Sequence, residues 1–153
     1  MRALFLAGRA IFGGFFAYNG VNHFQNKKMM TAYAESKGVP AAAAEAAIPA
    51  TGAMLLAGGL SIMAGARPKQ GLAAVIGFLI PVTLQMHRFW EAEDPRERMN
   101  EMVQFSKNVA LVGAALMLLQ IPAPWPISID EARAADEEMF IRLGGRDLRS
   151  LPA

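Results

Sequence analysis

The side chains best suited to chemistry stand at the ends of long apolar runs. Asn22 and His23 close the first run, and residues 83–90, Thr-Leu-Gln-Met-His-Arg-Phe-Trp, close the third. Lys107 and Asn108 precede the fourth. Imidazole, amide and ammonium groups donate hydrogen bonds, but placing a cation such as Lys107 at the centre of a bilayer costs about 2.5–3.5 kcal/mol. If these runs cross a membrane, each group needs a partner, water or a function.

The composition indicates that the runs do cross a membrane. Of 153 residues, 54% are hydrophobic and 18% are charged, and the mean hydropathy is +0.26, whereas soluble domains carry about 25% charged residues. Residues 48–66 carry no charge, while residues 91–101 carry seven charged side chains. The length suits one domain. Because the net charge of only +2 arises from basic residues scattered among acidic ones, we expect no nucleic-acid partner.

Four apolar segments have about the length of a membrane-spanning helix, roughly 17–25 residues. They cover about residues 3–24, 41–66, 71–90 and 108–121. The last is short unless its helix begins within 101–107, which would place Lys107 in the first turns. Pro49 and Pro81 should kink the second and third helices. We expect no cleavable signal peptide, because Arg9 interrupts the first apolar run and no small-residue cleavage pattern follows.

The remaining segments suggest surface structure. Residues 27–37 predict an interfacial helical turn that ends at Gly38 and Pro40. Ser128 and Glu131 match a capping box, which predicts a short C-terminal surface helix to about Leu143. The sequence therefore predicts an all-α protein, with a four-helix transmembrane bundle in residues 1–126 and a polar tail in residues 127–153.

Small residues recur every fourth position in the second span. This stripe predicts close helix packing, within the bundle rather than across a dimer interface. It consists of Ala53, Ala57, Ser61 and Gly65.

Antiparallel spans would bring the polar ends together on one membrane face. The predicted ligand-binding residues there come from three helices and are Asn22, His23, Thr83, Gln85, His87, Trp90, Lys107 and Asn108. Arg9 is a further predicted ligand-binding residue. It shares a helix face with His23 but lies about 21 Å away at about 1.5 Å per residue, so the two could mark the ends of one polar track. Alternatively, Arg9 snorkels to the interface and His23 caps its helix.

A cationic, hydrogen-bonding pocket of this kind suits a quinone head group or another carbonyl-bearing or anionic ligand. The structural alternative, without a ligand, is an aromatic belt with a buried imidazole and an interfacial lysine. Haem held between His23 and His87 is a less favoured alternative, because only two ligands and no carboxylate helper are evident. Zinc takes about three or four protein ligands, so we expect no metal site. The chain has no cysteine, and no Ser-His-acid arrangement identifies a catalytic nucleophile.

Several motifs in this order resemble the DoxX family of small membrane proteins. They are Gly8-Arg9, Asn22-His23-Phe24, Gly58-Gly59-Leu60-Ser61, residues 78–83 leading to His87-Arg88-Phe89-Trp90, and Phe105-Ser106-Lys107-Asn108. The resemblance covers about residues 3–121. It implies a four-helix membrane bundle associated with quinone-linked sulfur oxidation or with oxidative and thiol stress. Since this chain has no cysteine, any thiol chemistry would need a partner to supply the sulfur.

Two functions follow as expectations. The first is a membrane subunit of a quinone-linked or oxidative-stress oxidoreductase, in which a partner redox protein supplies the redox centre. The second is a non-catalytic membrane anchor or assembly factor, whose tail docks a soluble partner. A transporter is less favoured, because paired interrupted segments are not evident. We expect a multi-pass protein of a bacterial or archaeal cell membrane, surrounded by lipid, which could also form homo-oligomers. The long, charged tail favours cytoplasmic termini, although the basic residues of the two faces are balanced.

Overall fold

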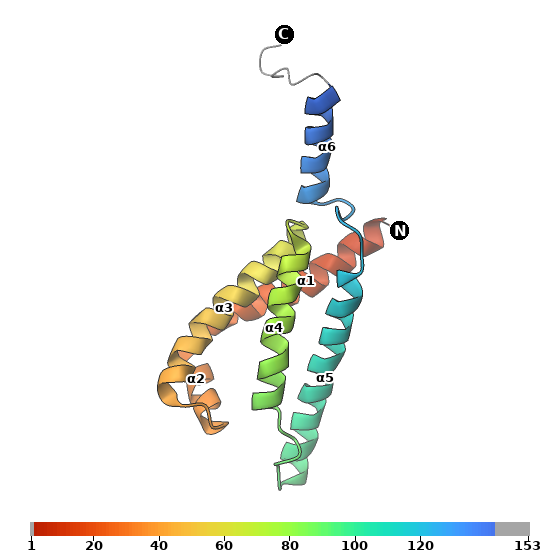
Figure 1. Ribbon diagram of the computed structural model, residues 1–153. Helices are drawn as coiled ribbons and strands as arrows, with labels where there is room; N and C mark the ends of the chain where they lie inside the picture. The colour runs from red at the N-terminus through yellow and green to blue at the C-terminus, as the bar shows by residue number, and fades with distance from the viewer. Residues whose placement is uncertain (1, 143–153) are drawn as a thin grey trace.

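The computed structural model describes residues 2–142, which fold into helices joined by short loops (Figure 1). The helices are α1 (Arg2–Gln25), α2 (Lys27–Ser36), α3 (Ala41–Ala64), α4 (Pro68–Met86), α5 (Pro95–Leu119) and α6 (Ile129–Arg142). Four of them, α1, α3, α4 and α5, are long and apolar enough to cross a membrane. The predicted all-α class with four spanning helices is therefore confirmed.

Glycines let α1 and α3 approach until their backbones touch. A Cβ atom added to Gly20 would lie 2.5 Å from the backbone nitrogen of Leu56, and one added to Gly59 would lie 2.4 Å from that of Ala17. Such contacts stabilise helix pairs where lipid gives no hydrophobic drive. Of the predicted stripe, Ala53 and Ala57 are exposed, whereas Ser61 packs closely against α4, where a Cβ atom added to Gly71 would lie 2.8 Å from its Oγ. Glycine contacts at neighbouring positions of α3 set the spacing instead.

The helices pack in a row, with α4 against α3 and α5 against α4. The apolar core contains Phe16, Leu55, Ile62, Leu72, Val75, Leu79, Ala115 and Trp125. The buried residues of α5 are Glu101, Asn108 and Ala115, which recur every seven positions on one face. Most of the apolar surface of α5 is consequently left for lipid or for another protein.

Two helix boundaries differ from the prediction at the loop between the third and fourth spans. Helix α4 ends at Met86, so His87 to Trp90 lie in the loop and do not share a helical face with Thr83. Helix α5 begins thirteen positions earlier than residue 108. The reason is an N-cap, since the Asp94 carboxylate accepts hydrogen bonds of 2.9 Å from the backbone nitrogens of Arg96 and Glu97, and Pro95 occupies the first turn.

The two surface segments are helical, as predicted. Helix α2 is a full helix rather than a single turn, and it lies beside the N-terminal end of α3 (Figure 1). Ser128 Oγ accepts a hydrogen bond of 3.0 Å from the backbone nitrogen of Glu131, which starts α6. The Glu131 carboxylate accepts from Ile127 rather than from Ser128, so the reciprocal contact of the capping box is displaced by one residue. The predicted helix end near Leu143 lies outside the described residues.

Candidate ligand-binding site

A cavity of about 370 Å³ lies among the ends of α1, α2, α3 and α4. Its wall is mainly apolar, and the polar side chains on it are those of His23, Tyr33, Thr51, Gln85 and His87. A largely apolar pocket with a few polar groups is the usual form of a small-molecule site. The apolar lining includes Met30, Ala34, Val39, Ala44, Ile48, Met54, Phe78, Pro81 and Val82.

His23 is buried, and its hydrogen bonds fix its tautomer. Its Nδ1 lies 3.2 Å from the carbonyl oxygen of Ile48 and 3.1 Å from Oγ1 of Thr51. The Thr51 hydroxyl donates to the Ala47 carbonyl at 2.7 Å, and a carbonyl only accepts, so Nδ1 of His23 carries the proton. In the neutral ring, Nε2 is then a hydrogen-bond acceptor.

Helix α4 contributes a second acceptor. Pro81 has no N–H and cannot donate to the carbonyl of Gly77 one turn earlier. Gly77 and Pro81 both line the cavity. The carbonyl of Gly77 that Pro81 leaves without its helical donor therefore lies at the cavity wall.

The connection between α2 and α3 is fastened to the end of α4. The backbone carbonyl of Lys37 accepts hydrogen bonds from Gln85 Nε2 at 3.0 Å and from Arg88 Nη2 at 2.9 Å. Gly38 follows with φ +86°, a conformation that favours glycine. These contacts place Gln85 on the cavity wall with its amide nitrogen already engaged.

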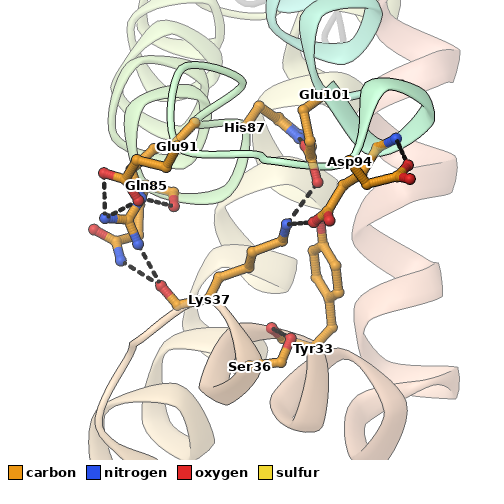
Figure 2. A network of polar contacts seen from close by, with 10 residues as sticks. Tyr33, Ser36, Lys37, Gln85, His87, Glu91, Asp94 and Glu101 are labelled. Atoms are coloured by element: carbon orange, nitrogen blue, oxygen red, sulfur yellow. Dashed lines mark hydrogen bonds and ion pairs between the residues drawn. The ribbon is translucent and has the colours of Figure 1, made fainter. Parts of the chain in front are cut away.

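The side chain of Lys37 meets a carboxylate that also holds His87 (Figure 2). Lys37 Nζ lies 2.6 Å from Glu101 Oε1 and 3.4 Å from Glu97 Oε1, while His87 Nδ1 lies 2.7 Å from Glu101 Oε2. The hydrogen bond to Glu101 raises the pKa of Lys37 above its ordinary value. Burial, followed by the charge of Glu101, raises the pKa of Tyr33.

A comparison against known families identifies the family of the chain. The DoxX family model matches residues 4–88, which is more than half of the chain. The chain belongs to the DoxX family. No curated protein and no solved structure gives a significant match.

The family match covers α1 to α4 and ends directly after His87. The lining residues of the cavity therefore all lie in the DoxX region, whereas Glu101, which bonds His87, lies beyond it. In this DoxX family member the wall of the cavity and the partner of His87 come from different parts of the chain.

Of the predicted site residues, His23, Gln85 and His87 meet at the cavity, and five others lie elsewhere. Asn22 accepts a hydrogen bond from Asn26. Thr83 is buried and donates to the carbonyl of Leu79, and it lines a smaller hollow between α4 and α5. Trp90 is half-exposed and lies beside Phe89 and Phe105. Lys107 is exposed and bonded to Gln104. Asn108 is buried on α5.

Arg9 lies at the opposite end of the bundle, where it fastens the segment between α5 and α6. Only 3% of it is exposed, and its guanidinium donates to the carbonyls of Ile127 at 2.6 Å and Pro126 at 3.3 Å. Arg9 lies on the same buried face of α1 as His23, as the sequence predicted. Arg9 is a buried anchor for backbone carbonyls.

The sequence reasoning missed Tyr33, Lys37 and Glu101 as site residues. Lys37 and Tyr33 belong to a segment treated as surface structure, and their role depends on how α2 folds back. Glu101 had a usable signal, because it stands seven residues before Asn108 and so shares its helix face. Recognising the Asp94-Pro95 cap would have extended α5 far enough to show this.

Proposed function

We propose that this DoxX protein is a membrane subunit of a quinone-linked oxidoreductase system, including one that serves oxidative stress, and that its cavity binds the quinone head group. The observation that carries the proposal is the apolar cavity with His23, Gln85 and His87 on its wall, contributed by separate parts of the fold. A quinone combines a flat apolar ring with carbonyl or hydroxyl oxygens. A pocket of this composition complements both parts.

The polar groups of the wall serve the two redox forms of such a ligand. In the neutral His23 ring, Nε2 accepts a hydrogen bond from a quinol hydroxyl, and the Gly77 carbonyl offers a second acceptor. A protonated imidazole would instead donate to a quinone carbonyl. In this proposal a partner redox protein exchanges electrons with the bound ligand, while the DoxX subunit binds it in the membrane.

Binding of a short-chain quinone to the full chain in lipid nanodiscs tests the proposal. Ala47→Trp would fill the cavity from α3, whereas Ala53→Trp adds the same bulk at an exposed position of α3 outside the cavity. We expect Ala47→Trp to weaken quinone binding at least about tenfold, a loss of about 1.4 kcal/mol, and Ala53→Trp to leave it unchanged. Equal affinity of both variants and the wild type would refute the assignment of the cavity.

The anchor function has one specific observation in its favour. Helix α6 exposes Phe140 and Ile141, at 51% and 68%, on a helix that has no buried residue. Such a surface suits a docking partner. Deleting residues 128–153 would then abolish co-purification of a soluble partner while preserving quinone binding. Loss of quinone binding with the partner still attached would contradict this second function.

A further inference from the structure

His87 and Glu101 separate two hollows of different character. His87 lines the apolar cavity, whereas Glu101 lines a charged recess of about 540 Å³ outside it. Besides Glu101, the recess is lined by charged residues that include Lys37, Arg88, Asp94 and Glu97. Because His87 Nδ1 and Glu101 Oε2 are 2.7 Å apart, one hydrogen bond connects the two hollows.

We infer that the His87–Glu101 pair is a path for proton exchange between a hydroxyl-bearing ligand in the cavity and water in the recess. The inference rests on the proposed function, since it requires a ligand with an ionisable hydroxyl. It assigns a function to Glu101, which is not in the cavity and lies beyond the matched family segment.

The geometry sets the direction of each hydrogen bond. An ionised carboxylate only accepts, so Nδ1 of His87 donates to Glu101, and in the neutral ring Nε2 has a free lone pair. The ammonium of Lys37, 2.6 Å from the other carboxylate oxygen, stabilises the negative charge of Glu101. Glu97 contacts Lys37 rather than His87. The other titratable groups around the pair are Tyr33, Arg88, Glu91, Glu93 and Asp94.

The proton transfer balances without any electron transfer. The ligand O–H bond breaks as an N–H bond forms at His87 Nε2, and the electron pair of the broken bond stays on the ligand oxygen. The Nδ1 proton passes to Glu101 and then to water in the recess. The imidazole is again neutral, with its proton on Nε2, and its return to the starting tautomer completes one cycle. One proton has moved from the ligand to the solvent.

Two features make Glu101 a better relay than the other acids of the recess. Only 9% of Glu101 is exposed, and each of its oxygens has a defined partner, so the carboxylate is held in place against His87. Glu97 lies one turn earlier on α5, and 56% of its side chain is exposed. Both acids touch Lys37, but Glu101 is the one bonded to His87.

The experiment uses a hydroxynaphthoquinone, whose absorption changes when its hydroxyl ionises. The probe is bound to the full chain in nanodiscs, and its ionisation is followed after a rapid change of pH in a stopped-flow instrument. We expect Glu101→Ala to slow ionisation of the bound probe about 100-fold, because positioned acid-base groups contribute about 10²–10⁴-fold. The probe should still bind, and acetate, which can enter the vacated recess, should restore the rate.

Glu97→Gln is the matched control, since it alters a Lys37 contact on the same helix and leaves the His87 bond in place. It should exchange protons at the wild-type rate. If the probe binds and Glu101→Ala exchanges normally, or if Glu97→Gln is equally slow, or if acetate restores nothing, the proton path is refuted and the quinone site stands. If the wild type does not bind the probe, both proposals fail.

Discussion

The guanidinium of Arg9 donates a hydrogen bond of 2.6 Å to the carbonyl of Ile127, 118 positions away in the sequence. The contact joins α1 to the segment that precedes α6 (Figure 1). The cavity lies at the other end of the bundle. A charge so deeply buried stabilises this junction through carbonyl oxygens.

We therefore predict that Arg9→Met destabilises the protein by about 2 kcal/mol, because hydrogen bonds to charged groups contribute about 1.5–3 kcal/mol. Amide hydrogen exchange at residues 127–131 should accelerate, while quinone affinity stays at the wild-type value. Arg9→Lys keeps the charge but cannot bond both carbonyls, so its stability should lie between those of the wild type and Arg9→Met. If quinone affinity falls while hydrogen exchange is unchanged, Arg9 belongs to the ligand-binding site instead.

Glycine contacts between α1 and α3 give a second prediction. Gly20→Ala should lower stability by about 1–3 kcal/mol, because its Cβ would meet backbone atoms at 2.5 Å and 2.7 Å. Gly14→Ala is the control on the same helix, since its Cβ would lie 3.8 Å from Met63 Sδ. The control should be neutral or stabilising by up to about 1 kcal/mol. Thermal unfolding in detergent compares them, and equal melting temperatures for the two variants would refute the backbone contact.

The ion pair of Lys37 predicts a dependence on alkaline pH. Its pKa is raised above 10.5 in the folded protein, so the stabilisation is fully present below the unfolded value and is lost as pH rises through the folded value. The raised pKa of Tyr33 acts with the same sign in its own alkaline range. Melting temperatures should fall from about pH 10 upward. Lys37→Met should remove the lysine contribution to this fall, and Tyr33→Phe should remove the tyrosine contribution. If the melting temperature of both variants depends on pH as in the wild type, these pKa shifts are contradicted.

The absence of cysteine makes the membrane orientation directly testable. Glu93→Cys introduces a single thiol in the loop between α4 and α5, and Asp136→Cys introduces one on α6. With cytoplasmic termini, a membrane-impermeant maleimide added to intact cells should label the first variant only. Permeabilised cells should show both. Labelling of the second variant alone would place the termini outside.

The sequence predicted the spanning helices well because apolar runs of bilayer length carry that information locally. The predicted end of α4 was wrong because Phe89 and Trp90 extend the apolar run beyond His87 and Arg88, and only the Asp94-Pro95 cap marks where the next helix begins. His23 and His87 were predicted on one face from antiparallel topology, and both line one cavity. Lys107 does not reach the cavity, because α5 begins thirteen positions before residue 108 and Lys107 lies outside the buried face formed by Glu101 and Asn108.

The Lys37–Glu101 contact could not be predicted from the sequence, for a different reason. It joins residues 64 positions apart, and its geometry depends on α2 folding back under α3. Charge patterning places both residues on the same membrane face, but it contains no information about which of several acids meets the lysine. Arg9 was similarly unpredictable, because its partners are backbone carbonyls, whose positions have no sequence signature.

The backbone and the side chain of Lys37 make separate contacts. Its carbonyl oxygen fastens the loop to Gln85 and Arg88, and its ammonium faces Glu97 and Glu101. Every amino acid supplies the carbonyl, whereas the ammonium belongs to lysine. The hydrogen bonds that hold the loop therefore do not depend on which residue stands at position 37. A mutation there can change the electric field beside the cavity while leaving the shape of the cavity unchanged.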